Sequence, residues 1–113
     1  MRTKRRKRLR NKEELKTAVH EWATKIKARP KEIRIQQMPR KWASCSDKGR
    51  ITFNSELFDQ SYAFQEFVIV HELVHLRIPN HGKLFKSLLN AHLPNSKDRA
   101  RRQARIDLRV AQA

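Results

Sequence analysis

The chemistry in this chain gathers at His71-Glu72-Leu73-Val74-His75, where two histidines lie four residues apart and a glutamate directly follows the first. On an α-helix this spacing places both imidazoles on one face, one turn apart, with roughly 6 Å between their Cβ atoms. Two such imidazole nitrogens can bind one zinc ion at about 2.0–2.1 Å each. Glu72 lies beside the metal but outside the row of ligands, where a general base for a zinc-activated water belongs. The motif therefore predicts a zinc-dependent hydrolase with Glu72 as its catalytic residue.

A catalytic zinc needs a third protein ligand and one open position. No glutamate follows His75 in the chain, which excludes the zinc peptidases whose third ligand is a glutamate on a later helix. The remaining candidates are His81, His92, Asp98 and Asp107. His81 is the best placed of them, because Pro79 cannot continue a helix and the chain must turn there. We expect the turn to bring His81 back toward His71 and His75, so that these three histidines hold the ion.

Two stretches resemble a known family. His71-Glu72-Leu73-Val74-His75-Leu76, with Pro79-Asn80-His81-Gly82 and Phe85, resembles the active-site signature of the YgjP-like metallohydrolases, which are similar to the SprT-like (Spartan-type) zinc metalloproteases. Arg40 to Ser46 resembles the family's Trp-Gly-Ser-Cys-Ser stretch, with Ala43 in place of the glycine. The resemblance covers about residues 33–93, and it implies a zincin-like fold, zinc on the three histidines, and Glu72 as acid and base. It also implies a short form, because the family's longer β-rich N-terminal part has no counterpart here.

The resemblance further implies a strand that holds the substrate. In zincins an edge strand above the active-site helix pairs with an extended peptide, and backbone pairing to a sheet edge is a general way to hold one. That role falls within residues 42–54, with Trp42, Ser44 and Cys45 as candidate substrate-binding residues. From the sequence alone, Cys45 is best interpreted as a small core residue. The alternatives for Cys45 are a zinc ligand or a nucleophile with a histidine partner.

The elements that must position these residues follow from periodicity and from helix-capping and turn residues. A helix is predicted over 12–28, with Asn11 as N-cap and Pro30 just beyond its end. Alternation of apolar and polar residues predicts strands at 33–38, 42–45 and 50–54. After these strands we expect a helical turn at 55–60, an active-site helix from about 61 to 77 and a helix over 83–93. We expect an α+β, minimal zincin-like domain in which a small, mostly antiparallel sheet packs against the N-terminal and active-site helices, with C-terminal helices.

Length and composition place limits on the class of protein. The 113 residues predict one domain, and 27 Lys and Arg against 11 Asp and Glu give a net charge of +16. One cysteine excludes an internal disulfide and suits a reducing compartment. No apolar run approaches the ~18 residues of a membrane span, and the basic N-terminus has no apolar segment of a secretory signal. We therefore expect a cytoplasmic protein with no membrane partner.

The positive charge is densest at the two ends. Residues 1–10 form a predicted disordered arm, residues 11–95 the catalytic domain, and residues 96–113 a basic C-terminal helix. Phosphate binding by counterion release would give both ends affinity for DNA or RNA, without base specificity. The alternative for each end is a solvated segment. The candidate nucleic-acid-binding residues are Arg2, Lys4, Arg5, Arg6, Lys7, Arg8, Arg10, Arg101, Arg102 and Arg105.

Three classes of function remain open. The first is a zinc metallopeptidase that hydrolyses the peptide bonds of a peptide or protein, including proteins bound to nucleic acid. The second is a zinc hydrolase of nucleotides or other phosphoanhydrides, for which the basic charge would suit the substrate. The third is a non-catalytic nucleic-acid-binding module that zinc stabilises. The presence of Glu72 favours the two enzymes, because a purely structural zinc site does not need it.

Overall fold

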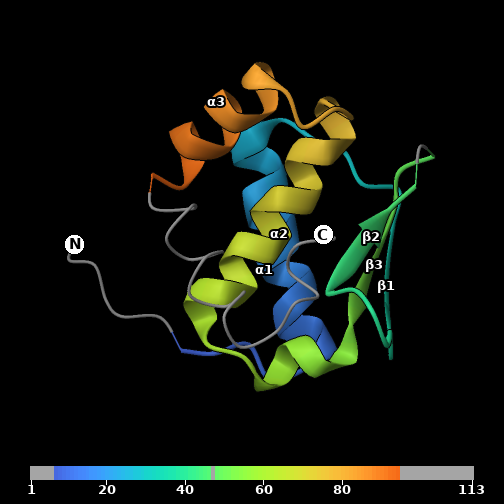
Figure 1. The fold of residues 1–113 in the computed structure, drawn as a ribbon. Coiled ribbons are helices and arrows are strands. Elements are labelled where there is room, and N and C mark those ends of the chain that lie inside the picture. The colour runs from blue at the N-terminus through green and yellow to red at the C-terminus, as the bar shows by residue number, and fades with distance from the viewer. Residues whose placement is uncertain (1–6, 47, 95–113) are drawn as a thin grey trace.

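A computed structural model describes residues 7–46 and 48–94 of the chain. Within them the elements run in the order α1, β1, β2, β3, η1, α2, α3 (Figure 1). Their bounds are α1 Lys12–Ile26, β1 Glu32–Gln36, β2 Ala43–Cys45, β3 Arg50–Asn54, the 3₁₀-helix η1 Ser55–Asp59, α2 Tyr62–Arg77 and α3 Lys83–His92. The predicted C-terminal helix over 96–113 lies outside the described residues.

The three strands form a mixed sheet in the order β1-β3-β2. β2 and β3 pair antiparallel as a hairpin, and Gly49 supports its turn with a φ of 91° that an L side chain rarely adopts. β1 instead runs parallel to β3, with Ile33 opposite Ile51. The Gly49 carbonyl accepts a hydrogen bond from the Lys31 amide at 2.8 Å and so starts this parallel pairing. The expectation of a mostly antiparallel sheet was therefore wrong in this detail, although the α+β class is confirmed.

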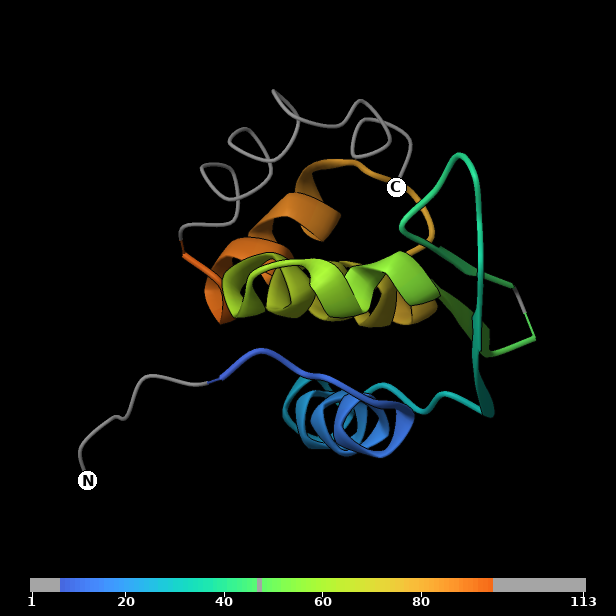
Figure 2. The same cartoon turned by 90° about the horizontal axis from the view of Figure 1, so that it is seen from below.

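α2 is the central element of the fold. Figure 2 shows it between α1 and α3, with the sheet at one end of this stack. Within Phe64–Val74 only Glu66 is not buried, because α2 packs against α1, α3 and β2 at once. Ser61 begins the helix by accepting a hydrogen bond from the Phe64 amide, and Arg77 ends it just before Pro79. The predicted active-site helix is thus present with the expected bounds.

α1 covers one side of α2. The Asn11 side chain accepts from the Glu14 amide at 2.9 Å and begins the helix, while Leu15 and Val19 point into the core. α1 ends at Ile26, two residues earlier than predicted, because Lys27 adopts a left-handed conformation with φ 65°. The Arg77 guanidinium of α2 donates to the Ile26 carbonyl at 3.0 Å and so joins the two helix ends.

The N-terminal segment is docked onto α2 through one buried side chain. Gln65 accepts from the Leu9 amide at 2.8 Å and donates to the Leu9 carbonyl at 3.0 Å. Gln65 is 1% exposed, so its amide group bonds to the Leu9 backbone inside the protein, in the way that a neighbouring strand would. Leu9, which the sequence placed in the disordered arm, is therefore held against α2. No helix among residues 7–46 and 48–94 has the length and apolar character needed to cross a membrane.

Candidate metal centre

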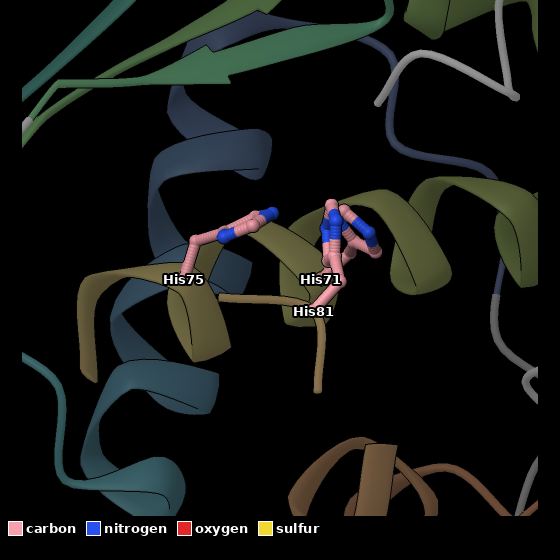
Figure 3. A group of neighbouring side chains, drawn as sticks. All are labelled: His71, His75 and His81. Atoms are coloured by element: carbon pink, nitrogen blue, oxygen red, sulfur yellow. The ribbon is translucent and has the colours of Figure 1, made fainter. Parts of the chain in front are cut away.

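Three histidines converge at the C-terminal half of α2. His71 and His75 project from one face of the helix, and His81 comes from the turn that follows it (Figure 3). One ring nitrogen of each lies within 4.8 Å of the corresponding nitrogens of the other two. The ring centroids are 4.9 Å apart for His71 and His75, and 4.4 Å apart for His75 and His81. The structure thus brings together the three residues that the sequence singled out as ligands.

The position of His81 depends on how α2 ends. Ile78 is extended, with φ −134° and ψ 97°, as expected for a residue before a proline. The chain then reverses through Pro79 and Asn80, and Gly82 begins α3 without a side-chain cap. His81 is exposed whereas His71 is buried, so the cluster has a closed inner side and an open outer side.

Phe85 on the first turn of α3 contacts the whole cluster. Its ring centroid lies 5.2 Å from that of His71 and 4.7 Å from those of His75 and His81. Phe85 is 2% exposed and therefore forms an apolar wall behind three polar rings. The sequence identified Phe85 as part of a motif and as an inward-facing residue, but not as a residue that packs on all three histidines.

Glu72 lies beside the cluster and is also buried. Its side chain is 3% exposed, and its Oε2 lies 3.4 Å from Nδ1 of His71. A carboxylate at this depth is sheltered from bulk water, yet it still lines the cleft into which His75 and His81 open. Glu72 can therefore reach a small molecule, such as water, that enters the cleft next to the histidines.

The surroundings favour neutral imidazoles. Burial lowers the pKa of His75 most, followed by the positive charge that His71 can carry, while Glu72 acts in the opposite direction. Burial is also the largest cause of the lowered pKa of His81. A hydrogen bond with the Pro79 carbonyl engages His75 as well. Such a bond fixes the ring and leaves the other nitrogen for a ligand role, and neutral imidazole is the form that binds metals.

A cleft of about 450 Å³ opens over the cluster. One side carries Glu72, His75 and His81, and the other side is β2, which is an edge strand of the sheet. The full lining is Lys41, Ala43, Ser44, Cys45, Ser46, Glu72, His75, Leu76, Pro79 and His81. An edge strand thus runs along the cleft that His75 and His81 line, which is the arrangement expected for an extended substrate.

The three candidate substrate-binding residues differ in their placement. Ser44 and Cys45 line the cleft from β2. Cys45 is half-buried and packs against the edge of the core, and burial, followed by the negative charge of Glu72, raises the pKa of its thiol to about 11. Trp42 is fully buried and packs edge-on against Phe64 at 5.2 Å. The structure contradicts the expectation that Trp42 contacts substrate, because a fully buried indole does not line the cleft.

Asn54 is a positioning residue that the sequence did not reveal. It is 1% exposed at the end of β3, and its Nδ2 donates to the carbonyls of Met38 at 2.7 Å and Lys41 at 2.8 Å. Its Oδ1 accepts from the amide of Glu56 at 2.9 Å. One side chain thus holds the irregular segment that leads into β2. The only sequence signal was an asparagine directly before a short helical turn, where such residues serve as N-caps.

His92, the other candidate ligand among the described residues, lies elsewhere. It ends α3 and packs edge-on against Trp22, with ring centroids 6.1 Å apart. It is not part of the histidine cluster.

Comparison with known families decides the class of this protein. A family model described as YgjP-like, metallopeptidase domain matches residues 2–105. The chain belongs to this family. It is therefore a metallopeptidase domain, and its histidine cluster marks the place where a metal can bind. The relation to SprT-like proteases stays a prediction.

Two solved metallopeptidase zymogens have a similar fold. The crystal structure of the metallopeptidase zymogen abylysin of Pyrococcus abyssi aligns with a TM-score of 0.72 and 19% identity, over 80% of this YgjP-like chain and 91% of that chain. The metallopeptidase zymogen jannalysin of Methanocaldococcus jannaschii aligns with a TM-score of 0.66 and 28% identity, over 74% and 86%. No curated protein matches the sequence.

Proposed function

We propose that this YgjP-like domain hydrolyses peptide bonds with one zinc ion held by His71, His75 and His81, and with Glu72 as general base. The observation that supports this most directly is the cluster itself. Three imidazole nitrogens lie within 4.8 Å of one another, and a buried carboxylate lines the same cleft. A purely structural zinc site is usually closed by four protein ligands, whereas a catalytic site has three and one open position.

The donor set fits zinc. Imidazole nitrogen is a preferred ligand of zinc, and the group of candidate ligands contains neither a thiolate nor a carboxylate. The lowered pKa values of His75 and His81 favour the neutral ligand form at physiological pH. Cys45, which the sequence left open as a ligand, lines the cleft but is not a member of the group.

In the reaction, Glu72 is the residue that moves protons. Bound zinc would supply a water of pKa roughly 7 and polarise the scissile carbonyl. The Glu72 carboxylate accepts a proton from the attacking water and then donates it to the leaving amine. Its burial excludes bulk water, and its place beside His71 keeps it within the cleft. The three histidines would hold the metal ion in place, and Phe85 packs against their rings so that these do not turn away from the ion.

The cleft favours a peptide over a phosphoanhydride. Among residues 7–46 and 48–94 its lining includes one lysine or arginine, Lys41, whereas the phosphates of a nucleotide require several positive or donor groups. By contrast, the edge of β2 offers backbone groups along the cleft, to which an extended peptide can pair. We therefore place the substrate along Ala43–Cys45 with its scissile carbonyl near His81 and Glu72.

The decisive experiment compares Glu72→Gln with His81→Ala. Zinc content is measured after purification, and casein hydrolysis is followed for both variants and the unchanged protein. Glu72→Gln should retain zinc and lose about 10²-fold or more of its activity, because the general base is missing. His81→Ala should lose both zinc and activity. Equal hydrolysis by Glu72→Gln and the unchanged protein would reject the mechanism, and hydrolysis of nucleotides alone would select the phosphoanhydride alternative.

A second role in binding DNA or RNA is favoured by the charge of the chain. Lys7, Arg8 and Arg10 are exposed where the N-terminal segment enters the domain. The other candidate residues of the two ends lie outside the described residues. Replacing these three residues by glutamine should lower the salt dependence of DNA binding, because fewer counterions are released. An unchanged salt slope would contradict this role.

The free thiol of Cys45 suits a reducing compartment, and we place the protein in the cytoplasm.

A further inference from the structure

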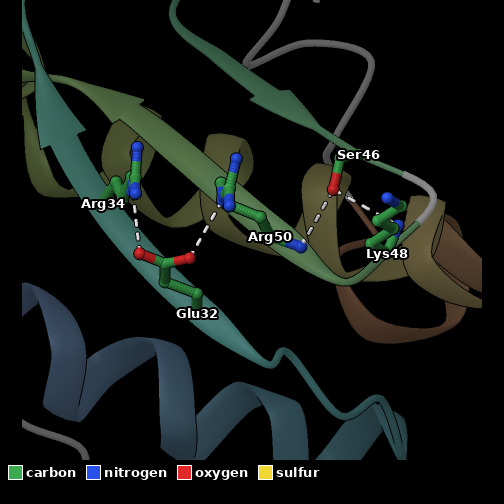
Figure 4. Close-up of polar contacts among 5 residues, drawn as sticks. All are labelled: Glu32, Arg34, Ser46, Lys48 and Arg50. Carbon is green, nitrogen blue, oxygen red and sulfur yellow. Dashed lines mark hydrogen bonds and ion pairs between the residues drawn. The ribbon is translucent and has the colours of Figure 1, made fainter.

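A second groove, of about 560 Å³, lies between α1 and β1. Figure 4 shows β1 between α1 and β3, so the groove follows the sheet edge that is opposite to the edge at the candidate metal centre. Its lining consists of Lys12, Lys16 and His20 from α1, together with the consecutive residues 30–36. No residue lines both this groove and the metal cleft.

The charge of this α1–β1 groove is positive on both walls. Lys12, Lys16 and His20 follow one another at intervals of four residues and therefore form one row along α1. Lys31 and Arg34 add two cations from the β1 side. Among residues 7–46 and 48–94, no ion pair engages Lys12, Lys16 or Lys31 with an acidic group.

Among the described residues of the lining, the one acidic side chain, Glu32, is already neutralised. Glu32 accepts from Arg34 Nε at 2.7 Å and from Arg50 Nε at 2.9 Å (Figure 4). These two arginines hold the pKa of Glu32 below its ordinary value. Glu32 is therefore engaged within the sheet, and the lysines of the groove remain available to an external anion.

The shape of the groove indicates an extended chain as its occupant. Every residue of β1 lines it, and an edge strand leaves half of its backbone donors and acceptors without a strand partner. Ile33 and Ile35 are half-buried at alternate positions, which is the spacing at which a paired strand presents side chains. Single-stranded nucleic acid suits the groove less well, because the described residues of its lining include no Phe, Tyr or Trp ring on which a base could stack.

We propose that the α1–β1 groove is an exosite for an extended acidic peptide segment, which adds as a strand to β1 and places its carboxylates against Lys12 and Lys16. Such a segment would belong to a protein substrate or partner of the peptidase. Binding uses main-chain hydrogen bonds for affinity and the lysine row for selection of acidic sequences. The inference goes beyond the proposed function and does not require the metal, so the two can fail separately.

The test measures binding by fluorescence anisotropy in the Glu72→Gln background, so that no peptide is cleaved. The probe is a labelled peptide of alternating glutamate and valine. Lys12→Glu combined with Lys16→Glu should raise its Kd at least about tenfold. Lys25→Glu is the control for a charge reversal elsewhere on α1: it makes the same change as each of the two groove substitutions, but Lys25 lies over the Trp22 ring and not in the groove. Lys25→Glu should leave the Kd unchanged. If it raised the Kd as much as the double substitution does, the proposal would be overturned.

A second measurement separates strand addition from charge attraction without altering the protein. Two further probes carry N-methyl groups on either the odd or the even residues of the same peptide. Strand addition uses the amides on one side of the peptide, so one probe should bind and the other should not. Equal binding of both probes, or displacement of the peptide by oligothymidylate at lower concentration than by unlabelled peptide, would overturn the proposal.

Discussion

Phe85 shows how an apolar residue can define a polar site. Its ring contacts all three histidines, with centroid distances of 4.7–5.2 Å, and it is almost completely buried. Leucine keeps this position apolar but cannot touch three rings at once, so Phe85→Leu should leave the imidazoles less well oriented. Zinc affinity should fall about tenfold, in the range typical of residues that orient ligands.

The measurement for Phe85→Leu is a competition titration of zinc against a chromophoric chelator. Leu84→Ala serves as the control, because Leu84 precedes Phe85 in the same helix but is 67% exposed. Leu84→Ala should bind zinc as the unchanged protein does. Equal zinc affinity for Phe85→Leu and the control would show that Phe85 only fills space.

Cys45 gives a pH-dependent signal at the same scale. Its raised pKa, to about 11, means that the thiol stays protonated in the folded protein well above neutral pH. The folded state therefore binds this proton more tightly than the unfolded state does. The resulting contribution to stability is present below about pH 9 and is lost as the pH rises toward 11.

Alkylation of Cys45 by iodoacetamide, without added metal, measures this directly. The folded protein should react with a midpoint near pH 11, and the chain unfolded in urea should react with a lower midpoint. Glu72→Gln should lower the folded midpoint in part, because the negative charge of Glu72 is the second cause of the raised pKa. A folded midpoint close to 9 would contradict the placement of Cys45.

At the scale of elements, Asn54 connects the sheet to the cleft. Residues 37–42 have no helix or strand, yet they set the position of β2. Asn54→Ala would leave the carbonyls of Met38 and Lys41 without this donor, at a cost of about 1–3 kcal/mol for each one that stays buried. Because β2 lines the substrate cleft, KM should rise more than kcat falls.

Urea unfolding and steady-state peptidase kinetics would test Asn54→Ala together. Gln37→Ala is the matched control, since Gln37 carries the same amide group but is exposed in the segment that Asn54 holds, and it lines neither the cleft nor the groove. The control should change neither stability nor KM. A loss of kcat with unchanged KM in Asn54→Ala would indicate that Asn54 acts on the histidine cluster and not on β2.

For the whole molecule, the sequence predicted what local patterns encode. The spacing of His71 and His75, the N-cap Asn11 and the break at Pro79 placed both long helices and the site. The direction of β1 was mispredicted, because alternation within a strand does not specify which strand it pairs with. Contacts between residues far apart in the chain could not be predicted from the sequence either. The bonds of Gln65 to Leu9 span 56 residues, and those of Asn54 to Met38 span 16.

The final prediction concerns how metal and fold are coupled. The three histidines come from α2 and from the turn that precedes α3, so a metal on them joins two segments of the chain. Only Phe85 and Leu89 of α3 are buried, so few core contacts hold this helix. A metal that joins the start of α3 to α2 should therefore add to the stability of this small domain. Zinc at about 1,000 times its Kd should stabilise the folded state by about 4 kcal/mol. For a chain of this size that corresponds to a rise in Tm of more than about 10 °C.

Thermal unfolding with excess zinc and with EDTA measures this coupling. In His81→Ala the difference between the two conditions should largely disappear, because the ion then joins only residues of α2. The Tm of His81→Ala in EDTA should stay near that of the unchanged protein, since His81 is exposed and makes few packing contacts apart from the cluster and Phe85. If zinc raised the Tm of His81→Ala as much as that of the unchanged protein, the metal would have to be bound elsewhere, and the three-histidine centre would be rejected.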